Sequence, residues 1–257
     1  MAIELSNISK SVKKTHYKMF LYSVEGCGKT TFGTMAPEPI FACAEDGLNA
    51  NGISNAPIKT YADLIELIGV LYKEDHGFKT FVVDSLTSFE PMLYAHLCEK
   101  EGVDSIEKVG GGFAKHRVES LPLWSTILQG MDALHSKGMN IILIGHSQSK
   151  EVRLPESEPY LKYEADLINP KAANMIYRWA DVIAFANYRT HVTTDDGAKK
   201  TGRGIGTGER VMFLEERPAF HAKNRFGLPP EMSFDYTVFS TELAAPATTN
   251  TTNQQGE

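Results

Sequence analysis

The chain has 257 residues, of which 42% are hydrophobic and 23% are charged, and its formal net charge is −6. This length is enough for one sizeable α/β domain with a real core, and too short for two full domains with linkers. The acidic balance argues against a dedicated duplex-DNA binder, although it leaves room for a local basic path.

No apolar run approaches the roughly 20 residues of a membrane-spanning helix. The first residues, Met1–Leu5, contain no apolar signal core. The three cysteines are an odd number at wide spacings, which fits neither a disulfide framework nor a zinc site and suits a reducing compartment. We therefore expect a cytoplasmic protein without a membrane partner.

Short apolar runs alternate with helix-like segments along the first part of the chain. This alternation predicts an α/β fold with a mostly parallel central sheet flanked by helices. The runs are nearly continuous in apolar residues, which is typical of strands buried on both faces. They cover residues 19–22, 40–44, 81–83, 141–144 and 182–186.

Helical periodicity fills the gaps between these runs. A segment that starts at Thr60 has the pattern of a capping box, with Asp63 three residues later and an apolar stripe behind it. A second stripe begins at Trp124 and stops near Gly138. Asn169 is expected to cap a third helix, because proline follows it in the first turn.

The pattern changes after residue 187. A polar, glycine-rich stretch over 188–208 predicts a hairpin or a loop, and strand-like residues follow at 211–214 and 219–221. From residue 244 onward the residues are almost all small or polar, which predicts a disordered tail. We therefore divide the chain into an N-terminal extension (1–17), a core domain (18–243) and a tail (244–257).

The segment between the first strand and the first helix has the pattern of a phosphate-binding loop. Gly28-Lys29-Thr30 matches the end of the usual motif, whereas Ser23 replaces its first glycine. Backbone N–H groups of such a loop bind phosphate, and the lysine adds a charge near the β- and γ-phosphates. We expect ATP to contact the loop residues Ser23, Val24, Glu25, Gly26, Cys27, Gly28, Lys29, Thr30 and Thr31.

Asp84 follows the third apolar run directly. A carboxylate at the end of a parallel strand beside a phosphate loop holds magnesium through water, and the loop threonine ligates the same ion. Thr30 and Asp84 are therefore the expected Mg²⁺ residues, with a plain strand-end aspartate as the alternative.

Several motifs occur in a fixed order: the loop just described, Ala44–Gly47, Val82–Ser85, Ile144–Gln148 and Ala222–Gly227. Together they resemble the RecA-like ATPases, and in particular phage-encoded single-strand annealing and recombination proteins, a type of AAA-type phage nucleotide-binding protein. The resemblance extends to about Pro230. It implies a RecA-like P-loop NTPase core with a C-terminal β-hairpin, and it implies ATPase activity.

The resemblance also implies roles for single residues. Lys29 and Asp84 keep the catalytic roles given above. Glu45 matches the glutamate that orients or deprotonates the attacking water; the alternative is a surface acid paired with its neighbour. His146 stands where relatives carry a sensor of the γ-phosphate, often glutamine, so a structural histidine is almost equally plausible, with Gln148 as a fallback sensor.

Lys223 and Arg225 are similar to the finger pair of DnaB-type helicases and to the paired lysines of bacterial RecA. In those families the pair reaches the ATP of the neighbouring subunit. The resemblance therefore implies a homo-oligomer, either a ring or a filament, in which both residues act in trans. The alternative is a basic strand end with no such role.

Two loops bind single-stranded DNA in these relatives. Their counterparts here are residues 110–117 and 149–169, in which basic and aromatic residues are interleaved. The leading hypothesis is a DNA-stimulated ATPase for recombination, annealing or repair, in the host cytoplasm if phage-encoded. The alternatives are a DnaB-type motor or helicase, a small-molecule kinase, and a nucleotide switch that hardly turns over ATP.

Overall fold

The computed structural model describes residues 16–45, 52–156, 158–193 and 203–245. The predicted extension and tail therefore lie almost entirely outside the described residues, as do Asp46 and Gly47 of the second-strand motif. Tyr17, which the sequence assigned to the extension, is buried and its hydroxyl lies 3.0 Å from that of Tyr236. This residue belongs to the core.

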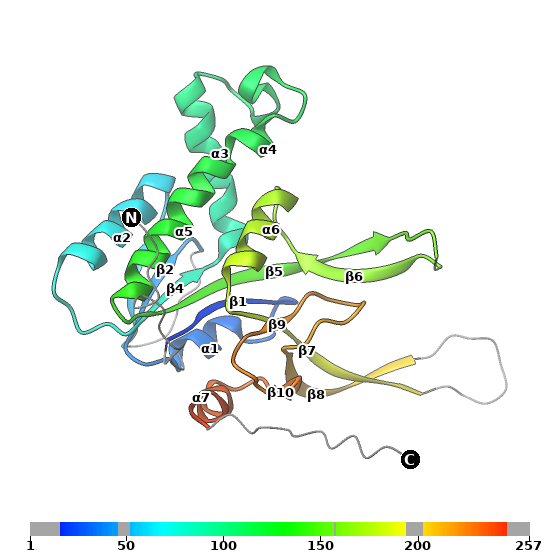
Figure 1. Cartoon of the computed structure of the whole chain (residues 1–257). Coiled ribbons are helices and arrows are strands. Elements are labelled where there is room, and N and C mark those ends of the chain that lie inside the picture. The colour runs from blue at the N-terminus through cyan, green and yellow to red at the C-terminus, as the bar shows by residue number, and fades with distance from the viewer. Residues whose placement is uncertain (1–15, 46–51, 157, 194–202, 246–257) are drawn as a thin grey trace, which may run out of the picture.

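Strands and helices alternate through most of the chain (Figure 1). The strands are β1 (Lys18–Ser23), β2 (Pro39–Cys43), β3 (Ser54–Pro57), β4 (Thr80–Asp84), β5 (Asn140–Val152), β6 (Tyr160–Ala165), β7 (Val182–Thr193), β8 (Arg203–Phe213), β9 (Lys223–Asn224) and β10 (Glu231–Ser233). The helices are α1 (Lys29–Thr34), α2 (Tyr61–Lys73), α3 (Leu86–Glu101), the 3₁₀ helix η2 (Ile106–Gly111), α4 (His116–Glu119), α5 (Leu121–Ser136), α6 (Pro170–Trp179) and α7 (Tyr236–Ala244).

The main sheet has the strand order β10-β8-β7-β1-β5-β4-β2-β3. From β7 to β3 all neighbouring strands are parallel, whereas β8 and β10 add antiparallel pairs at one edge. The mostly parallel sheet is confirmed, and the five apolar runs form β1, β2, β4, β5 and β7. The β7–β8 pair is the expected C-terminal hairpin.

The sheet is buried on both faces. Phe20 and Tyr22 of β1 belong to one core cluster, together with apolar residues of α2, α3, α5 and α6. Met19 and Leu21 point to the other face, where Phe32 of α1 packs with α7 residues. Since successive side chains of a strand point to opposite faces, the continuous apolar runs are explained by helices on both sides.

Local helix signals read from the sequence are confirmed. The Thr60 side chain accepts a hydrogen bond from the Asp63 N–H, and the Asp63 carboxylate accepts one from the Thr60 N–H. The Asn169 side chain caps α6. The stripe that starts at Trp124 forms the buried face of α5.

Several segments differ from the sequence-based prediction. Residues 149–169 contain the outer part of the antiparallel β5–β6 hairpin and are not simply a loop. Residues 219–221 form isolated bridges at Phe220 and no strand. Helices α3 and α7 were not predicted, and Phe239 of α7 is fully buried.

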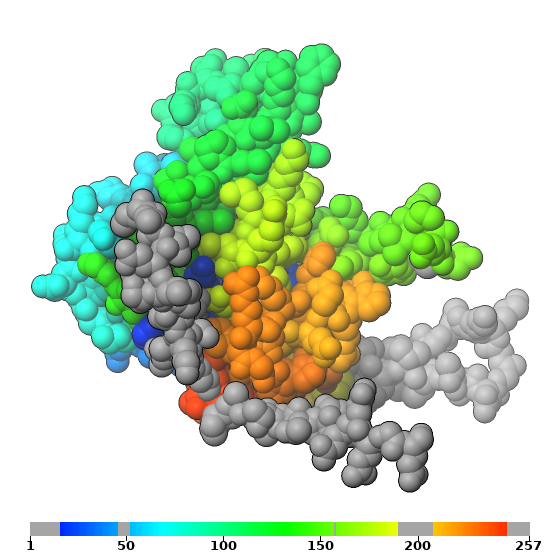
Figure 2. Space-filling model, in the orientation of Figure 1, coloured from blue at the N-terminus to red at the C-terminus, as the bar shows by residue number. Residues whose placement is uncertain are grey.

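Several parts of the molecule project from the sheet and its covering helices. They include the lobe made by the far end of α3, η2 and α4 and the β5–β6 hairpin (Figures 1 and 2), and the described part of the β7–β8 hairpin (Figure 1). The lobe has a small core of its own around Tyr94, Leu97 and Val109. Among the described residues, no helix is both long and apolar enough to cross a membrane.

Candidate active site

The phosphate-loop sequence connects β1 to α1. Ser23 is the last residue of β1 and is buried, so the position that departs from the usual motif continues the strand. Gly26 and Gly28 have φ angles of 69° and 101°, in the left-handed region that glycine enters without strain. The two turns of the loop therefore occur at glycines, and the missing first glycine is not needed.

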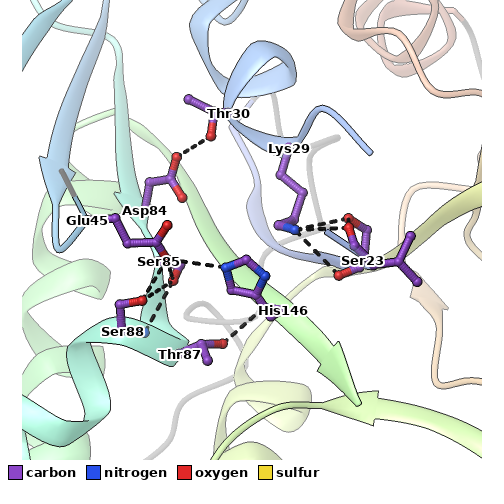
Figure 3. Close-up of polar contacts among 10 residues, drawn as sticks. Ser23, Lys29, Thr30, Glu45, Asp84, Ser85, Thr87, Ser88 and His146 are labelled. Atoms are coloured by element: carbon purple, nitrogen blue, oxygen red, sulfur yellow. Dashed lines mark hydrogen bonds and ion pairs between the residues drawn. The ribbon is translucent and has the colours of Figure 1, made fainter. Parts of the chain in front are cut away.

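Lys29 is folded back onto the loop. Its side chain is buried, and its ammonium group donates hydrogen bonds to the Ser23 carbonyl (3.4 Å), to Ser23 Oγ (3.2 Å) and to the Val24 carbonyl (3.3 Å) (Figure 3). Burial lowers the pKa of Lys29 from its ordinary value, and the nearby Asp84 carboxylate opposes this shift. A buried ammonium at this place is poorly compensated, which favours binding of an anion.

Thr30 and Asp84 meet beside the loop. The Thr30 hydroxyl donates a 2.6 Å hydrogen bond to Asp84 Oδ2 (Figure 3). Burial raises the pKa of Asp84, although the bond from Thr30 lowers it in part. A half-buried carboxylate next to a hydroxyl has the donor chemistry that Mg²⁺ prefers, and the pair fits an ion that takes its other ligands from water and phosphate. In the part of the chain that the structure describes, no three His, Cys, Asp or Glu side chains form a metal cluster.

Glu45 lies just beyond β2 and is held by one carboxylate oxygen. Its Oε1 accepts hydrogen bonds from Ser85 Oγ (2.5 Å) and Ser88 Oγ (2.6 Å), and lies 3.2 Å from His146 Nε2. Burial alone would raise the pKa of Glu45, but these hydrogen bonds outweigh it and lower the pKa. Within the described residues Oε2 has no hydrogen bond, so one oxygen fixes the side chain and the other is left for solvent.

His146 stands on β5, which separates β1 from β4. Its backbone N–H donates a 3.0 Å hydrogen bond to the Thr87 hydroxyl, which fixes the backbone from which the ring projects. Nδ1 of the ring is buried and has no hydrogen-bond partner among the described residues. In Figure 3 the ring lies between the Glu45 side and the Lys29 side of the site. An unsatisfied buried nitrogen there points to a group that the protein alone does not supply.

Sheet order explains how these residues converge. β1 has β5 and β7 as neighbours, so Asp84 on β4 and Glu45 after β2 are not on strands adjacent to the loop. Because the parallel strands end at the same edge, their carboxyl-terminal side chains still meet there. Glu45 therefore reaches the site although two strands, β5 and β4, lie between β1 and β2.

Lys223 and Arg225 are not brought to this edge. β9 pairs with the beginning of β7, at the opposite end of the parallel strands from the loop. Lys223 Nζ donates to the carbonyls of Tyr177, Arg178 and Ala180 at the end of α6. Arg225 pairs with the buried Asp181 at 3.0 Å. Both cations therefore have partners inside their own chain.

Sequence reasoning missed two groups at the site. Ser85 and Ser88, at the start of α3, donate hydrogen bonds to Glu45. No local sequence signal predicts contact with a residue about 40 positions earlier. Tyr188 and Arg210, on the stem of the β7–β8 hairpin, hydrogen-bond the carbonyls of Gly26 and Cys27. No sequence motif marks Arg210, and only the pairing of β8 with β7 brings it to the loop.

A buried parallel strand, a glycine loop with an inward lysine, and a strand-end aspartate on the loop threonine define a P-loop nucleoside triphosphatase. A family model described as an AAA domain matches residues 15–226. The chain therefore belongs to this family of AAA-type P-loop ATPases, which are nucleotide-binding domains. No curated protein matches the chain.

Proposed function

We propose that this AAA-type domain hydrolyses ATP with Mg²⁺ and that single-stranded DNA stimulates the reaction, in recombination, annealing or repair. The observation that carries the hydrolytic part is the geometry of Glu45. Three groups hold Oε1, Oε2 has no hydrogen bond among the described residues, 41% of the side chain is exposed, and these contacts lower its pKa. A fixed carboxylate with one open oxygen suits the orientation of an attacking water.

The other site residues supply charge and position. Lys29 would exchange its contacts with the loop carbonyls for the phosphates. Thr30 and Asp84 would hold Mg²⁺, directly and through water, and the ion would neutralise charge on the phosphates. His146, with its unsatisfied Nδ1, is placed to contact the terminal phosphate, and its bond to Glu45 would report that contact to the carboxylate.

The DNA part rests on the segment 110–117 in the projecting lobe. Phe113 is 97% exposed, so its whole ring is available to a ligand. Lys115 and Arg117 are also exposed, and among the described residues neither has a carboxylate within ion-pair distance. An exposed aromatic ring beside two free cations is the pattern that stacks unpaired bases and neutralises their phosphates.

The second predicted DNA segment supports the proposal less well. Lys150 lies 3.5 Å from Glu164, and Arg153 lies 2.9 Å from Glu151, so the charges of the β5–β6 hairpin largely cancel. Since such surface pairs are weak, a strand of DNA could compete for them, but it would gain less than at residues 110–117.

A chain of hydrogen bonds connects the lobe with the catalytic side chains. Asn169 Nδ2 donates to the Arg117 carbonyl at 2.7 Å. In the same short segment, the Asp166 N–H donates to the His146 carbonyl at 2.9 Å. His146 in turn contacts Glu45. DNA that binds at residues 110–117 and shifts residues 166–169 would therefore act on Glu45, the residue proposed to orient water.

The test is steady-state ATP hydrolysis with Mg²⁺, with and without an oligothymidine strand. The wild type should be stimulated, and Phe113→Ala should weaken DNA binding roughly fivefold to a hundredfold, because stacking of one base contributes about 1–3 kcal/mol. Tyr72→Ala, which removes an exposed aromatic ring on α2, outside both predicted DNA segments, is the matched control. Turnover that ignores DNA would refute the DNA part, and turnover that ignores Glu45→Gln would favour a nucleotide switch.

The subunit arrangement is a separate proposal. A homo-oligomer with Lys223 and Arg225 acting in trans requires both side chains to leave their present partners, the end of α6 and Asp181. The contacts inside the chain favour a structural role for the pair. Mixing of variant subunits, described in the Discussion, separates the two roles.

A further inference from the structure

The stem of the β7–β8 hairpin lies against the phosphate loop. Tyr188 and Arg210 are register partners on β7 and β8, so both side chains point to the same face of the hairpin. Tyr188 Oη donates to the Gly26 carbonyl at 2.9 Å, and Arg210 Nη1 donates to the Cys27 carbonyl at 3.2 Å. Two successive loop carbonyls are thus bound by one cross-strand pair.

Arg210 is close enough to the loop to act on its ligand. A β-carbon added at Gly28 would lie 2.5 Å from Arg210 Nη1, so only glycine lets the guanidinium approach this far. One bond to the Cys27 carbonyl uses one of the five N–H donors of an arginine. Within the described part of the chain the guanidinium has no carboxylate partner, although the side chain is exposed. An exposed cation without a counter-charge at the phosphate loop suits an anionic ligand.

The neighbouring arginine behaves differently. Arg189 follows Tyr188 on the same strand but pairs with Glu209 at 3.0 Å and with Glu231 at 2.6 Å. Two residues of like charge on one hairpin stem therefore face different surroundings: one faces carboxylates, and the other faces the loop.

Arg210 approaches the loop from the side opposite the carboxylates. In the sheet, β7 and β8 lie on one side of β1, whereas β5, β4 and β2, which carry or precede His146, Asp84 and Glu45, lie on the other. If Glu45 orients the attacking water, in-line transfer puts the leaving group on the far side of the transferred phosphoryl. Arg210, on β8, lies across β1 from Glu45 in the sheet order, which is consistent with this side.

We propose that Arg210 is a nucleotide-binding residue supplied in cis, which contacts the diphosphate that ATP and ADP share, and that Tyr188 helps to hold it there. The proposal rests on nucleotide binding by the AAA-type domain and needs no DNA. It differs from a finger on the terminal phosphate, because ADP lacks that phosphate and should feel the loss of Arg210 as strongly as ATP does.

The experiment is calorimetric titration with Mg·ADP and with a Mg complex of a non-hydrolysable ATP analogue. Arg210→Gln keeps an N–H donor for the Cys27 carbonyl but removes the charge, and it should weaken both ligands about tenfold to a hundredfold. Arg210→Lys keeps the charge and should lose less. Arg189→Ala, the matched control, should bind both ligands within about twofold of the wild type. Thermal unfolding of each variant shows that it is folded.

The outcomes separate the possibilities. Equal weakening for both ligands supports the assignment. Weakening for the ATP analogue alone would move Arg210 to the terminal phosphate and overturn it. Unchanged affinities for both ligands in Arg210→Gln would reduce the residue to a clamp on the Cys27 carbonyl and would also overturn it. A wild type that binds Mg·ADP but does not hydrolyse ATP would refute the proposed hydrolysis and leave this inference intact.

Discussion

Lys223 offers a direct choice between a structural residue and a finger acting in trans. Its ammonium donates to the carbonyls of Tyr177 at 2.8 Å, Arg178 at 3.1 Å and Ala180 at 2.5 Å. Such carbonyls at a helix end have no partner in the helix and carry its negative dipole end. Lys223→Met keeps the aliphatic stem and removes the charge and all donors, so it isolates the capping role.

The magnitude follows from the three bonds. Each hydrogen bond contributes about 0.5–1.5 kcal/mol net. The pKa of Lys223 is lowered, mainly by burial and to a lesser extent by the nearby charge of Arg225. Desolvation of the ammonium therefore offsets part of the stabilisation from the three hydrogen bonds. We therefore expect a loss of about 2 kcal/mol in the free energy of unfolding, which lowers Tm by roughly 4–8 °C in a domain of this size.

Circular-dichroism melting curves measure this loss. Lys171→Met is the matched control, because Lys171 is an exposed lysine on the same helix. It should change Tm by less than about 1 °C, as is usual for surface positions.

Subunit mixing tests the alternative. If Lys223 acts in trans, a mixture of Lys29→Ala and Lys223→Met chains should hydrolyse ATP, since one chain keeps the loop and the other keeps the finger. A Lys223→Met protein with unchanged Tm, no ATPase activity, and activity restored by mixing would refute the helix-capping role.

Three further predictions concern the site and its support. Glu45→Gln should lower the rate of phosphate release roughly 10²–10⁴-fold, while Mg·ADP affinity stays near that of the wild type; loss of both together would contradict a role in orienting water. Asp84→Asn should raise the Mg²⁺ concentration for half-maximal hydrolysis about 10- to 100-fold, and an unchanged Mg²⁺ dependence would remove Asp84 from the ion. Glu90 is buried, accepts hydrogen bonds from the Ile168 and Asn169 N–H groups, and has its pKa raised by burial from 4.5 to about 7. Because the folded state then binds more protons than the unfolded state between these values, the free energy of unfolding should fall as pH rises from about 4.5 to 7, by up to roughly 3 kcal/mol. Glu90→Gln should abolish this fall, which urea titrations at pH 5 and 7.5 measure. A variant whose free energy of unfolding falls as much as that of the wild type would refute the assignment of the pH dependence to Glu90.

The β5–β6 hairpin shows where sequence patterns fail. A strand is recognised by alternation of apolar and polar residues, which requires one face to be buried. The outer part of this hairpin projects from the body (Figure 1), and Leu161 is 67% exposed. With both faces largely solvated the alternation disappears, so the segment looked like a polar loop.

Helix α7 escaped prediction for a different reason. It has only nine residues, and its burial depends on Phe239 packing against Tyr17 and Phe32, from the opposite end of the chain. A helix this short is held by tertiary contacts more than by its own propensity.

Sequence patterns were enough to predict the features whose chemistry is local: the glycine loop with Lys29 and Thr30, the cap at Thr60, and the buried strands. Each depends on residues a few positions apart, which constrain the backbone directly. The distant side chains that share the site could be identified only from the fold. The contact between Glu45 and His146 joins residues 101 positions apart, and the contact between Arg210 and Cys27 joins residues 183 apart. Such pairs follow from strand order, which no local pattern encodes, and the same order directed Lys223 and Arg225 to the end of α6 and away from the loop.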